Sequence, residues 1–314
     1  MKQRSQYLGI LLGVVYGLFI RLLGEPERFA DYYQIFSITF IWITPMIIGL
    51  FPILFASNEL YKSKLKLFFY PVLTVILFLI TAVVTQIEDL VCLLILGLPF
   101  LIGAGVIGLF LGLFVKRSVS NKKLYSIILL PLFLSPIENT FPNKTETFAV
   151  SSEIIINKSK VEIFPKLLDV PSISDQEYST GFYQAIGIPR PVDSKTFKDA
   201  TGWYRIGTFT DNLILYETIS AMEPYKFVNF KIDLHKSQLR EKPTDQHVLK
   251  SNYFNFENIN YSLVELTKNQ TKVILNCDYK INSKMNFYAN FWARSIILDF
   301  EKRLLAAIKI KLEH

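Results

Sequence analysis

The residues best suited to proton transfer or ion-pair chemistry lie in the second half of the sequence. His235 and His247 are available for proton transfer near neutral pH, and they flank a polar loop at residues 236–246. Solvated loop histidines are the ordinary interpretation, and a general base is the alternative. Arg205 and Glu217 lie on either side of a turn at 210–212. A three-residue loop places them directly opposite each other, whereas a two-residue loop would shift the pairing by one. Such a pair either anchors a polar group inside an apolar cavity or joins two strands at a rim or surface.

Apolar and aromatic side chains in the same region either fill a core or line a ligand cavity. For a single aromatic residue a place in the core is the simpler interpretation, whereas the set can line a cavity if the fold encloses one. His247 and Glu217 are the catalytic candidates. No zinc-ligand cluster, P-loop or nucleophile elbow occurs in the sequence, so we expect neither a metal nor a cofactor. The expected lining residues are Trp203, Arg205, Phe209, Tyr216, Glu217, Phe230, Leu275, Cys277, Tyr279 and Trp292.

The composition divides the chain into two halves that meet near residue 143. Residues 1–143 contain 11 Lys and Arg and 7 Asp and Glu, and the remaining 171 residues contain 23 and 20. Soluble domains are about one-quarter charged, a proportion that the second half matches and the first half does not reach. Cys92 and Cys277 lie in different halves, so we expect two free, buried thiols. The net charge of +7 is too small to indicate a nucleic-acid-binding protein.

The first half is typical of a transmembrane helical region. A spanning helix needs about 20 apolar residues, and we expect spans at 7–23, 35–56, 67–86 and 90–115. A fifth apolar run, residues 124–137, is short for a span. Ala104, Gly108 and Gly112 recur at intervals of four and predict a face on which a neighbouring helix packs closely.

Lysine and arginine in the loops predict the orientation of these helices. Basic residues cluster at the N-terminus, at 62–66 and at 116–123, which places these segments in the cytoplasm. If 124–137 crosses the membrane, the second half is extracytoplasmic. If this run is re-entrant or interfacial, the second half is cytoplasmic. We expect a crossing, and hence an extracytoplasmic domain of an integral protein, in a bacterial cytoplasmic membrane.

The second half, residues 144–311, alternates in ways that predict an α+β domain. A strand at 148–156 is followed by Ser159 and Glu162, which form a capping box, and by a helix with Val161, Phe164, Leu167 and Leu168 on one face. The expected later strands are 203–209, 213–221, 226–234, 249–256, 261–266 and 271–281.

Two features of this region can be stated residue by residue. In the last strand, Val273, Leu275, Cys277, Tyr279 and Ile281 share one face. A long helix from Phe287 to about Lys311 then repeats Ala293, Ile297, Phe300, Leu304 and Ile308 at helical spacing. Residues 312–314 are similar to the beginning of an affinity tag, so we expect them to have no function.

The order of these elements resembles the START-like superfamily, also called SRPBCC or birch-pollen-allergen-like, which includes polyketide cyclase-type proteins. The residues that carry the resemblance are 153–157 before the capped helix, 202–205 with Phe209, and the final helix from 287–292 to 308–309. The resemblance covers about half of the chain. It implies a curved antiparallel sheet wrapped on the C-terminal helix, with an apolar ligand between them. The whole chain is similar to bacterial membrane proteins in which such a domain follows several spans.

Three functions fit these expectations. The first is a membrane-anchored module that binds a lipid or another apolar small molecule beneath the C-terminal helix. The second is a cyclase- or dehydratase-type enzyme that uses the same cavity. The third is a structural or assembly protein whose cavity is filled by its own side chains. The expected partners are the lipid bilayer and an apolar molecule, with no nucleic acid.

Overall fold

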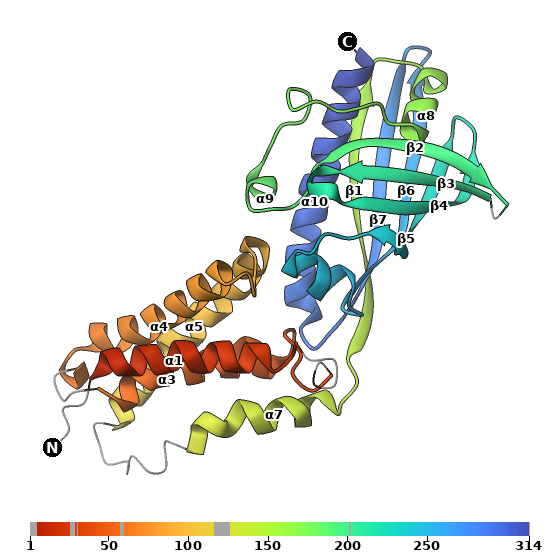
Figure 1. The fold of residues 1–314 in the computed structure, drawn as a ribbon. Helices are drawn as coiled ribbons and strands as arrows, with labels where there is room; N and C mark the ends of the chain where they lie inside the picture. The colour runs from red at the N-terminus through yellow and green to blue at the C-terminus, as the bar shows by residue number, and fades with distance from the viewer. Residues whose placement is uncertain are drawn as a thin grey trace. The chain divides into compact units, whose positions relative to one another are not determined.

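The chain forms two compact units, shown in Figure 1. The computed structural model describes residues 5–25, 29, 31–56, 60–115, 126–200 and 202–313, with only the backbone of 111–115. The first unit contains residues 1–144 with Ser283–Met285, and the second contains the rest. The basic residues at 116–123 and at the N-terminus, on which the predicted orientation depends, lie outside the described residues.

The first unit is a bundle of apolar helices. Its long elements are α1 (Gln6–Leu22), α3 (Thr44–Leu54), α4 (Lys64–Val84), α5 (Leu90–Val115) and α7 (Leu130–Asn139). Shorter pieces are η1 (Thr39–Ile43), η2 (Leu60–Lys62) and η3 (Ser126–Leu129). Helix α4 and the part of α5 at Leu90–Phe110 are long and apolar enough to cross a membrane, and the other apolar helices are shorter.

The outward-facing surface of this bundle is apolar as well as its interior. Large exposed side chains include Leu11, Phe19, Phe69, Ile80 and Val106, which are between 50% and 59% exposed. A water-soluble helix would carry polar residues on such a face. The described helices thus expose large apolar side chains as well as burying them.

Glycines allow the helices to pack closely. A Cβ atom at Gly108 would lie 2.2 Å from the backbone oxygen of Leu67, and Ala104 is fully buried against α3. The predicted packing face is thus confirmed at Ala104 and Gly108, while the packing around Gly112 is not described. A second close contact, not predicted from the sequence, lies on α1, where a Cβ at Gly13 would lie 2.9 Å from the carbonyl oxygen of Ile48.

Helix α7 ends against the loop that follows α1. The Glu138 carboxylate accepts hydrogen bonds from the backbone amides of Ile38 (2.7 Å) and Thr39 (2.8 Å), which open the next helical segment. The Ser135 hydroxyl donates to the carbonyl of Tyr32 at 2.9 Å. The C-terminal end of α7 therefore lies at the end of the bundle where α1 finishes, opposite the end where α1 begins.

The second unit is one strongly curved sheet with a long helix on its concave side (Figure 1). The strands are β1 (Lys144–Ile156), β2 (Pro191–Asp199), β3 (Gly202–Phe209), β4 (Ile214–Glu223), β5 (Phe227–Gln238), β6 (Phe254–Thr267) and β7 (Gln270–Ser283). Their order is β1-β7-β6-β5-β4-β3-β2, with antiparallel pairing from β7 to β2. The helices are α8 (Lys160–Leu168), α9 (Phe182–Ala185) and α10 (Asn286–Glu313), with short turns η4 (Thr210–Asn212) and η5 (Asp245–Leu249). This is the architecture that the START-like resemblance implies.

Local sequence signals account for most of these elements. The capping box at Ser159 and Glu162 is present, and the side chains of β7 alternate as predicted. The predicted face of α8 was wrong in one position, because Val161 is 54% exposed and Ile163 is buried in its place. The strand β2 was missed, and the separate strands predicted at 249–256 and 261–266 are one continuous strand, β6, preceded by η5.

The interior between sheet and helix consists of two apolar clusters. The first core cluster lies near the C-terminal end of α10 and contains Ile156, Ile163, Phe164, Leu167, Val170, Ile173, Tyr178, Val228, Phe230, Tyr261, Leu263, Val273, Leu275, Leu304, Leu305, Ala307 and Ile308. The second core cluster contains Val150, Cys277, Tyr279, Ile281 and Ile297. Both are buried against the concave face of the sheet.

Candidate functional site

Arg205 and Glu217 form an ion pair inside the second unit. They lie directly opposite each other on β3 and β4, as the hairpin register predicts, and are 5% and 4% exposed. The guanidinium Nε donates to Glu217 Oε2 at 2.5 Å, and one terminal nitrogen donates to the carbonyl of Leu167 at 2.8 Å. The guanidinium also lies 3.6 Å from the ring centre of Phe230. The ion pair is therefore buried, and it links the β3–β4 hairpin to the last turn of α8. It is not a surface pair.

Most of the predicted lining residues face the interior. Phe230, Leu275, Cys277 and Tyr279 are buried there together with the ion pair. Phe209 is half-buried and lies 6.1 Å from Phe300 of α10, centre to centre.

Three predicted lining residues lie elsewhere. Tyr216 follows the alternation of β4 and lies on the outer face, where its ring stacks on Tyr204 at 4.8 Å beneath the ammonium of Lys236. Trp203 is 46% exposed. Trp292 packs against Tyr288 and Phe291 of its own helix, and belongs to neither core cluster. The prediction treated aromatic residues as a group, and period-2 alternation would have excluded Tyr216 once Glu217 was placed inside.

The histidines are not part of this interior. His235 is exposed on β5, and His247 lies in η5, before β6. The predicted loop between them contains a buried ion pair instead: the guanidinium of Arg240 binds both carboxylate oxygens of Asp245, at 3.0 and 2.7 Å. This pair fixes the turn that carries His247.

The most unusual group of the interior is the carboxyl of Glu301, which was not predicted from the sequence. It lies on α10, is 2% exposed, and neither of its oxygens has a hydrogen-bond partner among the described residues. The Ser152 hydroxyl of β1 is also buried without a partner. Burial raises the pKa of Glu301 to about 7, opposed by the neighbouring Ser152 hydroxyl. The carboxyl is therefore largely protonated below neutral pH.

The other titratable groups near Glu301 remain protonated at physiological pH. Burial raises the pKa of the Cys277 thiol above its usual range, with a smaller contribution from the Glu301 charge. Burial raises the pKa of Tyr261 and of Tyr279 to about 12. The Tyr279 hydroxyl donates to Asn290 Oδ1 at 2.7 Å. Cys277 consequently behaves as a small apolar side chain and not as a thiolate nucleophile.

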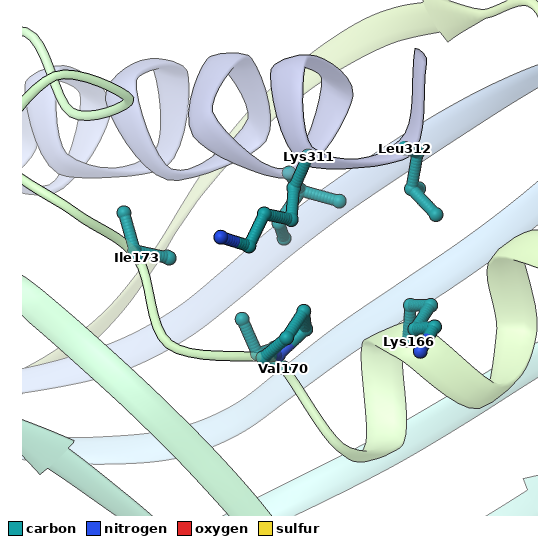
Figure 2. A pocket seen from close by; sticks show the side chains of 7 residues that line it. Lys166, Val170, Ile173, Lys311 and Leu312 are labelled. Atoms are coloured by element: carbon teal, nitrogen blue, oxygen red, sulfur yellow. The ribbon is translucent and has the colours of Figure 1, made fainter. Parts of the chain in front are cut away.

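A small pocket lies beneath the C-terminal end of α10, as Figure 2 shows. Its volume is about 150 Å³. Ile308, Lys311 and Leu312 of α10 form one side, and α8 with the segment after it forms the other, through Lys166, Val170, Pro171 and Ile173. Leu312 continues the helix and packs on the first core cluster.

One of the two lysines at this pocket is already paired. The Lys311 ammonium donates to both carboxylate oxygens of Glu177, at 2.8 and 3.0 Å. This ion pair and hydrogen bonds from Ser174 lower the pKa of Glu177 to about 2. Lys166 is exposed on α8. The pocket therefore has apolar walls and positive charge at its edge.

Comparisons with known proteins give fold-level likenesses only. No family model matches the chain, and no curated protein matches it. Similar solved structures include an uncharacterized protein from Bacillus thuringiensis (10% identity, TM-score 0.32, covering 53% of this chain and 100% of that one). The Zhui aromatase/cyclase from Streptomyces sp. R1128 is 11% identical, with a TM-score of 0.32 over 54% of this chain and 94% of that one. A norcoclaurine synthase point mutant from Thalictrum flavum is 12% identical, with a TM-score of 0.34 over 54% of this chain and 96% of that one. At these scores the likenesses carry no argument about activity.

Proposed function

We propose that this protein is a membrane-anchored START-like module that binds a lipid or another apolar small molecule beneath its C-terminal helix. The observation that carries the proposal is the pocket between α10 and α8, with apolar walls formed by Val170, Ile173 and Ile308. Burial of apolar surface is the main source of affinity in such a site.

The size of the pocket limits the part of the ligand that it holds. An apolar protein cavity of about 150 Å³ takes a molecule the size of benzene, whereas drug-sized ligands fill about 300–1,000 Å³. The pocket, at about 150 Å³, therefore accommodates a ring or the end of an acyl chain. Lys166 at its edge favours a ligand with an acidic group, such as a fatty acid, whereas Lys311 is already paired with Glu177.

Anchoring in the membrane is supported by the first unit. Its described helices are apolar on their outward faces, and two of them have the length and composition of spans. The position of α7 also supports the expected topology. Because α7 ends beside Ile38 and Thr39, after the end of α1, the chain leaves the bundle opposite the N-terminal end of α1. This position of α7 supports our proposal of an extracytoplasmic second unit, the topology predicted from the basic loops.

The enzymatic alternative receives no support from the residues predicted for it. The carboxylate of Glu217 is occupied by Arg205, and His247 lies outside both core clusters. Binding without catalysis is the function that these contacts favour.

The proposal is tested by loading the detergent-extracted full chain with deuterated palmitate and measuring the retained palmitate by mass spectrometry. Val170→Trp fills the pocket, and Lys166→Glu reverses a charge at its edge without touching the core. Val161→Trp is the matched control, since Val161 is 54% exposed on α8.

We expect Val170→Trp to retain at least about tenfold less palmitate than the wild type. This corresponds to a loss of about 1.4 kcal/mol of binding free energy. Lys166→Glu should retain less than the wild type, and Val161→Trp should match it. Equal retention by all four proteins, or none by the wild type, would contradict the proposal.

A further inference from the structure

The pocket under α10 contains an ammonium group that a carboxylate of the chain already binds. Lys311 lines this pocket, and Figure 2 shows its side chain extending from α10 toward Ile173. Its ammonium donates to Glu177 Oε1 at 2.8 Å and to Glu177 Oε2 at 3.0 Å. Glu177 does not itself line the pocket, so its carboxylate binds the ammonium without filling the apolar space.

A turn of the chain holds this carboxylate in place. Glu177 Oε2 accepts hydrogen bonds from the backbone amide of Ser174 at 2.8 Å and from the Ser174 hydroxyl at 3.0 Å. The next residue, Tyr178, is 1% exposed and belongs to the first core cluster, so the turn is fixed to the interior. The pKa of Glu177, lowered to about 2 by Lys311 and by the hydrogen bonds from Ser174, keeps the carboxylate charged at physiological pH. The turn thus presents an oriented negative charge to Lys311.

The ion pair is open to exchange with a ligand. The Lys311 side chain is 29% exposed and the Glu177 side chain is 21% exposed, so water and solutes reach both. Partly exposed pairs of this kind contribute little net stability. A lysine ammonium is a compact charge with three rotatable donors, and it binds any carboxylate that reaches it. The carboxylate of a ligand whose chain lies in the pocket is therefore able to replace that of Glu177.

We propose that Glu177 is an internal competitor that determines which ligands the pocket prefers, because it occupies the ammonium that would otherwise bind the acid group of a ligand. An acidic ligand has to displace Glu177 before it pairs with Lys311, whereas a neutral ligand of the same length leaves the ion pair intact. Since the competitor belongs to the same chain, it acts at a high effective concentration and weakens the binding of acidic ligands selectively. The inference rests on the proposed function, since it concerns the ligand of the same pocket.

A neighbouring acid provides a matched control for the charge of the turn. Asp175 lies two residues before Glu177, is 86% exposed and pairs with Arg190 instead of Lys311. Asp175→Asn therefore removes the same charge from the same turn without freeing the Lys311 ammonium. Lys166 lies on the α8 side of the pocket and is exposed, so its attraction for an acid group is the same in all the variants compared below.

The test is a competition between two probes of equal chain length, deuterated palmitate and deuterated hexadecanol. An equimolar mixture is loaded onto the detergent-extracted full chain, and the ratio of retained palmitate to retained hexadecanol is measured by mass spectrometry. The ratio does not depend on the folded fraction of a variant, because both probes bind to the same folded molecules. The variants are Glu177→Gln, Asp175→Asn and the double variant that combines Glu177→Gln with Lys311→Met.

We expect Glu177→Gln to raise the ratio about fivefold, the gain that one partly exposed ion pair supplies. Asp175→Asn should keep the wild-type ratio, and the double variant should not exceed it, since no ammonium is left at position 311 to bind the acid. An unchanged ratio in Glu177→Gln, an equal rise in Asp175→Asn, or a rise that persists in the double variant would each overturn the inference.

The proposed function is checked separately in the same experiment by the total amount of both probes. Retention by the wild type that is lost in Val170→Trp supports binding in the pocket, whatever the ratio. An unchanged ratio with normal retention therefore overturns the role of Glu177 alone, whereas a wild type that retains neither probe overturns both proposals.

Discussion

The buried carboxyl of Glu301 predicts an unusual dependence of stability on pH. Its pKa is about 7 in the folded protein, against a reference value of 4.5. Because this pKa is raised by folding, the stabilisation is complete below about pH 4.5 and is lost as pH rises through 7. Between these values unfolding releases a proton. At about 1.4 kcal/mol per pH unit, the total loss is about 3 kcal/mol.

Glu301→Gln removes this titration while keeping the shape of the side chain. We expect the difference in unfolding free energy, wild type minus Glu301→Gln, to fall by about 3 kcal/mol from pH 4.5 to pH 8. Urea titrations of the full chain in detergent measure it, followed by the fluorescence of Trp203 and Trp292 in a Trp42→Phe background. Glu153→Gln is the control and should give a flat difference. A flat difference for Glu301→Gln as well, or one that rises with pH, would refute the assignment of a buried, uncompensated carboxyl.

The remaining predictions concern packing and the buried ion pair. Arg205→Met should lower the unfolding free energy by about 3–5 kcal/mol, because it leaves the Glu217 carboxylate buried alone, and adding Glu217→Leu should restore most of this loss. Urea denaturation checks both, and an unrestored double variant would contradict the pairing. Cys277→Asp should cost more than about 2 kcal/mol and Asp278→Asn less than about 0.5, since only Cys277 faces the core; equal costs would reverse the faces of β7. Gly13→Leu should lower the melting temperature of the helical bundle, measured by circular dichroism, because a Cβ there already meets the backbone of α3.

Elements with a strong local signal could be predicted from the sequence. The capped helix α8, the hairpin that places Arg205 opposite Glu217, and the alternation of β7 all follow from short patterns. Strand β2 was missed because its sequence, PVDSKTFKD, is polar and begins with proline. It forms because β3 supplies the pairing partners along its whole length. Whether such a segment forms a strand depends on its pairing with a neighbouring strand, and a local sequence pattern does not contain this information.

The candidate site was predictable only where position could be inferred from periodicity. Alternation on one strand accounts for the burial of Leu275 and Cys277, and their role in lining a ligand cavity stays a prediction. Glu301 was missed because a glutamate within a helix is normally solvated, although it lies four residues after Ile297 and three before Leu304, on the predicted apolar face. A charged residue within an apolar helical stripe was the available signal. The pocket depends on the segment after α8, for which no periodic pattern exists.

Photo-crosslinking tests the central claim, that an apolar ligand lies beneath the C-terminal helix. A palmitate analogue with a diazirine near the end of its chain is bound to the full-length protein in detergent, activated by light, and located by peptide mass spectrometry. We expect crosslinks in residues 166–173 and 308–312, the two sides of the pocket, and their loss when an excess of unlabelled palmitate is added. Crosslinks confined to the apolar helices of residues 6–110, unaffected by that competitor, would contradict the account.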